Sequence, residues 1–127
     1  MENPENRPRI YNRIKTFKVD KPWGYYVDYF RNESVAFKKI VVAPNEELSY
    51  QYHNDRDEFW YVVSGSGILI VNNDETYVGE GSSVLIKREE KHTIKCVSPK
   101  RLVIYEMQVG RPSEGDIVRL EDKYGRN

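Results

Sequence analysis

Short apolar or alternating segments recur along this sequence at intervals of roughly ten residues, and this recurrence restricts the fold more than any other feature. The segments are TFKV (16–19), YYVDYF (25–30), VAFKKIVVA (35–43), LSYQYH (48–53), EFWYVVSG (58–65), GILIVN (67–72), SSVLIK (82–87), HTIKCV (92–97) and RLVIYEMQV (101–109). Asn, Asp, Gly, Ser and Pro stand in the breaks between them, as turns require. The pattern predicts antiparallel hairpins and an all-β sandwich or barrel.

The length of 127 residues suits a single domain with one core. We expect the polar, proline-containing start (1–14) to be a flexible arm and 15–127 to form the domain. The charged carboxy-terminal stretch (114–127) is the best helix candidate, but it is short and polar, and a strand with a trailing turn is the alternative.

Composition excludes several classes of function. Lysine plus arginine (20) balances aspartate plus glutamate (20) without a separate basic run, so we expect no nucleic-acid partner. No segment has the ~20 apolar residues of a membrane span or the apolar core of a signal peptide, so we expect a cytoplasmic protein. The single cysteine, Cys96, excludes an intrachain disulfide, and its apolar neighbours predict a core position.

Three polar side chains are predicted to converge on one spot. Gln51 and His53 lie two residues apart on an alternating segment, so they point to the same face of a strand. Glu58 follows a polar four-residue break, and a hairpin would return its carboxylate beside His53. Such residues can share a metal ion. The alternative is that they are ordinary polar residues on a solvent-facing side of the sheet.

The glycines around these residues extend the pattern. Six residues separate Glu58 from Gly65, and ten residues separate Gly81 from His92. This spacing resembles the two sequence motifs of the cupins, with Gln51 in place of the first motif histidine. The resemblance implies a double-stranded β-helix and one divalent metal ion (Zn, Mn, Co, Fe or Ni) held by Gln51, His53, Glu58 and His92.

One cupin subfamily resembles the chain over about a hundred residues, in order. Its members are the type II phosphomannose isomerase domains, usually found at the carboxy end of bifunctional mannose-1-phosphate guanylyltransferase/mannose-6-phosphate isomerases. The resemblance rests on KPWG (21–24), FKKIVVAPN (37–45), LSYQYHNDRDEFWYVVSG (48–65), EMQVG (106–110) and EGDIVRLEDKYGR (114–126). No glycine-rich nucleotide loop of the transferase part is present, so we expect a stand-alone isomerase-type domain.

The resemblance implies an enzyme that interconverts mannose 6-phosphate and fructose 6-phosphate through an enediol, with the metal as a Lewis acid. The small-molecule partner would then be a sugar phosphate. Two alternatives stay open: a non-catalytic metal-containing cupin that binds a sugar or nucleotide sugar as a sensor or accessory subunit, and a metal-dependent oxygenase. Cupins often pair, so we also expect a homodimer.

The subfamily's two tail arginines correspond to Arg119 and Arg126, which the resemblance assigns to phosphate or substrate contact. Arginine suits this role because its planar guanidinium stays charged and binds oxyanions through two N–H groups. The alternative for both is a surface ion pair with Glu121 or Asp122.

The subfamily also has basic residues at two positions nearer the expected metal. Arg56 would orient substrate there, and its alternative is a charge in a hairpin turn. Lys38 would face the barrel interior if Lys39 faces outward, and the reverse is equally open. No residue is identified as the general acid or base.

The chain departs from the subfamily at several positions. Asn54, Asp55 and Phe59 stand where the subfamily has further histidines, so a lost histidine would need a substitute such as Asp55 or Asp57 for proton transfer. Lys87 and Glu89 replace a proline and a glycine of the second motif. Asn45 replaces a glycine, and asparagine tolerates the positive φ that such a turn requires.

Overall fold

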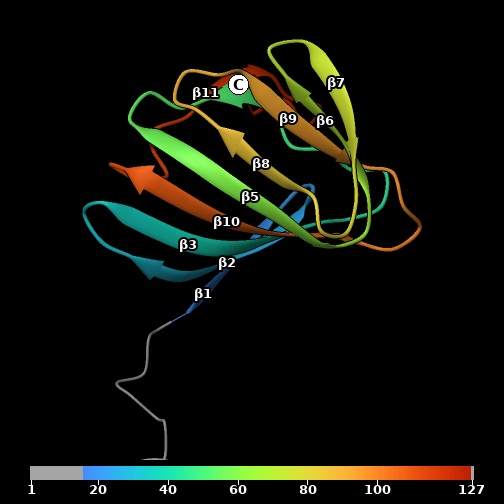
Figure 1. Ribbon diagram of the computed structural model, residues 1–127, viewed down its shortest axis with the longest axis horizontal. Helices are drawn as coiled ribbons and strands as arrows, with labels where there is room; N and C mark the ends of the chain where they lie inside the picture. Colours follow the sequence, from blue (N-terminus) through green and yellow to red (C-terminus); the bar gives the residue numbers. More distant parts are fainter. Residues whose placement is uncertain (1–15, 127) are drawn as a thin grey trace, which may run out of the picture.

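Two antiparallel β-sheets face each other in the computed structural model, which describes residues 16–126 (Figure 1). The six-stranded sheet has the order β1 (Phe17–Lys21), β2 (Gly24–Arg31), β3 (Val35–Val42), β10 (Leu102–Gly110), β5 (Arg56–Ser64) and β8 (Ser83–Ile86). The five-stranded sheet has the order β11 (Val118–Glu121), β4 (Tyr50–Tyr52), β9 (His92–Cys96), β6 (Gly67–Val71) and β7 (Asp74–Val78). The predicted all-β fold is confirmed.

Each of the nine predicted segments overlaps one strand, and two strands lie outside them. The first is β7, an edge strand whose first four residues are all exposed, so it has no apolar alternation to reveal it. The second is β11, which pairs with β4 and shows that the strand alternative for the carboxy-terminal stretch is right. The predicted arm, 1–14, lies outside the described residues.

Along the strands, every second side chain points into the interior. On β5, every second residue from Arg56 to Val62 is buried, and on β10 every second residue from Leu102 to Gln108 is buried. The apolar members join a core that includes Trp60, and Cys96 is fully buried there, as predicted. The polar members of the same strands stay inside as well, which leaves one part of the interior lined with charged side chains.

Three turns among residues 16–126 carry non-glycine residues with positive φ, at Asn45, at Asn72 with Asn73, and at Glu89. Asn45 has a φ of 66°, so the turn predicted to survive the loss of glycine does so. Glu89 has a φ of 69°, and its backbone N–H donates to the carbonyl of His53 at 2.7 Å. Among residues 16–126 no helix is long and apolar enough to cross a membrane.

Candidate metal centre

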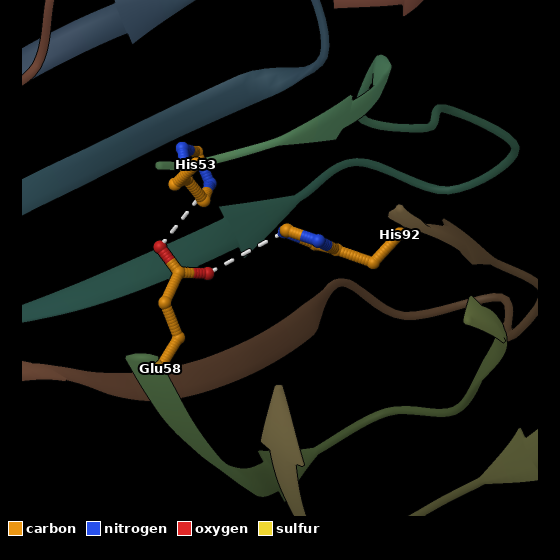
Figure 2. Close-up of side chains that lie close together, drawn as sticks. All are labelled: His53, Glu58 and His92. Atoms are coloured by element: carbon orange, nitrogen blue, oxygen red, sulfur yellow. Dashed lines mark ion pairs between the residues drawn. The ribbon is translucent and has the colours of Figure 1, made fainter. Parts of the chain in front are cut away.

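Three buried side chains from separate segments of the chain meet inside the barrel (Figure 2). His53 directly follows β4, Glu58 lies on β5, and His92 begins β9. Their ligand atoms all lie within 4.8 Å of one another. His53 Nε2 is 3.3 Å from Glu58 Oε2, and His92 Nε2 is 3.5 Å from Glu58 Oε1. The carboxylate therefore lies between the two imidazoles.

Backbone carbonyls orient both imidazole rings. His53 Nδ1 is 2.6 Å from the carbonyl oxygen of Asp116, and His92 Nδ1 is 2.8 Å from that of Glu90. A carbonyl only accepts hydrogen bonds, so each Nδ1 is assigned as the protonated nitrogen. Each Nε2 then faces Glu58. Metal-ligating histidines use this arrangement, in which a hydrogen bond from one ring nitrogen orients the other toward the ion.

The donor set fits a divalent cation. His92 Nε2 and Glu58 Oε1 are buried and have no hydrogen-bond partner among residues 16–126. Two unpaired buried atoms that face each other are costly unless a cation or proton lies between them. Burial lowers the pKa of His53 to about 4, so its imidazole is neutral at pH 7, as metal ligation requires. His53, Glu58 and His92 could therefore hold a metal ion.

Gln51, the fourth predicted ligand, lies beside this group. Its backbone is the register partner of His92, and its Nε2 is 3.5 Å from His53 Nε2. Its Oε1 accepts a 2.6 Å hydrogen bond from the Ser49 hydroxyl. A 180° rotation of the amide would turn the oxygen toward the imidazoles, and the hydroxyl could then accept from the amide nitrogen. The geometry is compatible with a fourth ligand after that rotation.

Arg56 is buried against the same ligands and is not a charge in an exposed turn. Its Nε donates to Glu58 Oε2 at 2.9 Å, and its Nη1 donates to the carbonyl of Ser113 at 2.7 Å. Its Nη2 lies 3.3 Å from His53 Nε2. Only 4% of Arg56 is exposed, so the ion pair with Glu58 is shielded from water. Arg56 therefore supplies a positive charge next to the carboxylate.

A cavity adjoins the metal-ligand group, which consists of His53, Glu58 and His92. The cavity walls carry five cationic and three anionic side chains: Lys21, Lys38, Arg56, Arg119, Arg126, Glu58, Glu106 and Glu114. Lys38 faces this interior, while Lys39 is more exposed. Lys38 Nζ is 2.8 Å from Glu114 Oε1 and 3.8 Å from Glu106 Oε1. The excess of positive charge suits an anionic ligand.

The two tail arginines both line the cavity, but they differ in their hydrogen-bond partners. Arg119 lies on β11, and its buried Nε has no hydrogen-bond partner within the described chain. Arg126 instead binds the Asp122 carboxylate through Nε at 2.7 Å and Nη2 at 3.0 Å. The ion pair with Asp122, one of the alternatives for Arg126, is therefore present in the structure. Arg119 has a donor free for a ligand.

The sequence analysis did not predict three residues of the site, Glu106, Glu114 and Asp116. Glu106 lies on the buried side of β10, and the alternation of apolar residues in RLVIYEMQV could have predicted that its side chain points inward. Glu114 and Asp116 belong to the loop between β10 and β11, which carried no comparable pattern. The Asp116 carboxylate accepts from the backbone N–H groups of Asn54 and Asp55, each at 2.9 Å, so this loop holds the turn after His53.

The fold and the arrangement of His53, Glu58 and His92 define a cupin. Comparison with known proteins supports this class and narrows it. Residues 10–122 match the family described as the mannose-6-phosphate isomerase C-terminal domain. The chain belongs to that family, and the resemblance found in the sequence is confirmed.

Curated relatives include the mannose-1-phosphate guanylyltransferase ManC of Salmonella typhimurium, which is 36% identical over 86% of this chain and 23% of that protein. The xanthan biosynthesis protein XanB of Xanthomonas campestris is also 36% identical, over 86% of this chain and 24% of that protein. The chain thus spans about a quarter of the length of these relatives.

Solved structures show the same fold. The capsular polysaccharide assembling protein CapF from Staphylococcus aureus aligns with a TM-score of 0.73 and 18% identity, over 85% of this chain and 35% of that one. An RmlC-like cupin from Shewanella frigidimarina aligns with a TM-score of 0.69 and 19% identity, over 80% of this chain and 88% of that one. At these identities the likeness shows the fold alone.

Proposed function

We propose that this protein is a metal-dependent sugar-phosphate isomerase that interconverts mannose 6-phosphate and fructose 6-phosphate. One observation carries the proposal: His53 and Glu58 of the metal-ligand group line the same cavity as Arg119, which has a free donor, and this cavity has an excess of positive charge. A sugar phosphate has the two features that this cavity accommodates, a hydroxyl-bearing end and an anionic end. Membership of the isomerase family supports the same substrate class.

A divalent metal held by His53, Glu58 and His92, with Gln51 as a possible fourth ligand, would act as a Lewis acid toward the oxygens on the first two sugar carbons. The chain's own residues perform the other tasks. Asp116 keeps His53 Nε2 directed inward through the carbonyl contact at Nδ1. Arg56 holds the Glu58 carboxylate in its orientation. Arg119 supplies charged N–H groups for the phosphate.

Asn54, Asp55 and Phe59 replace histidines of the subfamily, so their positions relative to the cavity affect whether the reaction can be retained. Asn54 and Asp55 are exposed, and Phe59 is 46% exposed on the outer face of β5. None of the three lines the cavity, and neither does Asp57, which instead bonds to Arg88. The substitutions therefore lie away from the cavity wall. This placement supports an isomerase that has kept its reactive interior.

The test is a coupled assay of mannose 6-phosphate conversion by the purified full chain, with metal content measured in the same samples. We expect turnover that is lost on verified demetallation and returns with Mn²⁺, Co²⁺ or Zn²⁺. The variant Arg119→Ala should raise KM at least about tenfold, the loss expected for one charge-assisted contact, with metal content unchanged. The matched control is Arg101→Ala, because Arg101 is exposed and lies outside the cavity wall.

Three results would contradict the proposal. Catalysis that persists in metal-free protein would exclude the Lewis-acid role. Saturable binding of mannose 6-phosphate without any turnover would instead support the alternative of a non-catalytic sugar-binding cupin. Consumption of dioxygen by the iron-loaded protein would point to the third class, an oxygenase.

A further inference from the structure

A buried carboxylate at the cavity wall has no role in the metal-ligand group. Glu106 lies on β10, between β3 and β5, and is 3% exposed. Its Oε2 accepts a 2.8 Å hydrogen bond from Trp60 Nε1, and its Oε1 accepts a 2.6 Å hydrogen bond from Gln108 Nε2. Both donors are neutral. Each carboxylate oxygen retains a second lone pair for another partner.

The isomerase reaction needs a group that accepts a proton from carbon, and few groups in the cavity qualify. Glu58 lies between the two imidazoles and is paired with Arg56. Glu114 is half-exposed and held by two cations, Lys38 at 2.8 Å and Arg31 at 2.9 Å. Glu106 faces one cation, Lys38, at the longer distance of 3.8 Å. It is the cavity carboxylate least committed to a positive partner among residues 16–126.

Lys38 is a poor base but a suitable proton donor. Burial by itself would lower the pKa of Lys38, but the charges of Glu106 and Glu114 outweigh burial and raise that pKa. The side chain therefore stays an ammonium group at neutral pH. It also lies 4.2 Å from the centre of the Tyr26 ring, which favours the charged form. A fixed ammonium next to a carboxylate gives the cavity an acid and a base side by side.

We propose, on the basis of the isomerase function proposed above, that the Glu106 carboxylate carries the proton between the first two sugar carbons while the Lys38 ammonium serves the two sugar oxygens. In the direction from aldose to ketose, the C2–H bond breaks and its proton binds Glu106. The electron pair forms the carbon–carbon double bond of the enediol, and O1 takes a proton from Lys38. Glu106 then returns its proton to C1, and O2 loses its proton to Lys38. Both side chains end in their starting states.

The environment of Glu106 suits this task. Burial and the nearby charge of Glu58 raise the pKa of Glu106 to about 7, although Lys38 and Arg56 lower it. A general base works best when its pKa lies near the working pH. A purely structural role is the competing explanation, because Glu106 also anchors Trp60. The experiment must therefore separate loss of proton transfer from loss of structure.

The experiment compares the full chain with its Glu106→Gln variant in deuterium oxide. Nuclear magnetic resonance follows deuterium incorporation at C1 and C2 of the sugar phosphate, and kcat, KM, metal content and melting temperature are measured in parallel. We expect Glu106→Gln to lower kcat and the exchange rate at least about 100-fold, as for other general bases. KM and metal content should stay unchanged. Glu121→Gln, on an exposed residue outside the cavity wall, is the matched control.

Glu106→Asp covers the case in which the glutamine variant folds poorly, because it keeps a carboxylate and only shortens the side chain. It should fold and retain slow exchange. Wild-type activity in either variant would overturn the assignment of Glu106 while leaving the isomerase proposal intact. A slow variant that has also lost metal, with activity restored by excess metal, would likewise overturn it in favour of a structural role. Absence of turnover by the unmodified chain would contradict the proposed function itself.

Discussion

Replacing Arg56 by methionine tests whether the buried carboxylate at the metal-ligand group depends on a cation. Arg56 and Glu58 are 4% and 2% exposed, and their charged groups approach to 2.9 Å. At an effective dielectric constant near 20 and a charge separation of about 4 Å, such a pair gains about 4 kcal/mol. Removal of one partner from a buried pair typically costs 3–5 kcal/mol, because the other charge is left unpaired. Methionine retains most of the apolar packing.

We therefore expect Arg56→Met to lower the free energy of unfolding by about 3–5 kcal/mol in chelator-treated protein. Added Mn²⁺ or Co²⁺ should restore a large part of this loss, since a metal ion would neutralise Glu58 in place of the guanidinium. At a metal concentration of about 100 times Kd, binding alone contributes about 2.7 kcal/mol. The variant should also bind metal more tightly than the unmodified chain, because it lacks the nearby positive charge.

Urea unfolding followed by circular dichroism, with and without metal, measures the first effect, and titration calorimetry measures the second. The matched control is Arg88→Met, because Arg88 is 51% exposed and pairs with Asp57 at 3.4 Å. An exposed pair of this kind contributes about 0–1 kcal/mol. The reasoning is refuted if Arg56→Met unfolds within about 1 kcal/mol of the wild type in chelator, like the control.

Further predictions concern stability and assembly. Glu89→Gly should raise the free energy of unfolding by about 0.5–1 kcal/mol, because Glu89 holds a φ of 69°, and a lower urea midpoint would contradict this. Hydrogen bonding to Arg126 lowers the pKa of Asp122 from 3.8 to about 2, so the pair stabilises the fold above pH 4 and ceases to do so as the pH falls through 2. Asp122→Asn should therefore cost about 1 kcal/mol at pH 7, after allowance for the partly exposed arginine, and only a small fraction of that at pH 2; equal losses at both pH values would refute the linkage. The homodimer remains a prediction. Phe59 and Leu85 are 46% and 57% exposed on the outer face of the six-stranded sheet, where they could contact a second copy. The double variant Phe59→Lys with Leu85→Lys should therefore be monomeric in light scattering. A monomeric unmodified chain would contradict it.

Local patterns in the sequence were enough for most of the fold. Alternation identified nine strand segments, and the two-residue spacing of Gln51 and His53 with the hairpin to Glu58 predicted their convergence. The same reasoning missed β7, where polar edge residues carry no alternation. His92 was assigned as a ligand only through its resemblance to the cupin motif, since it lies far along the chain from His53.

Other features depended on how the strands are assembled. The sequence allowed either Lys38 or Lys39 to face inward, and the register of β3 against β10 selects Lys38. The loop between β10 and β11 contributes Asp116 to the turn after His53 across 62 residues of chain, and no local signal predicts this contact.

The sequence by itself therefore determined nine of the eleven strands among residues 16–126, the family and the residue types of the metal-ligand group. Only the tertiary structure decided that Arg56 pairs with Glu58, that Arg119 has a free donor, and that Glu106 lies beside Lys38. The physical reason is one of range. Side-chain alternation and turn preference act over a few residues, whereas the pairing, burial and protonation of a charged group depend on neighbours that the fold brings from distant strands.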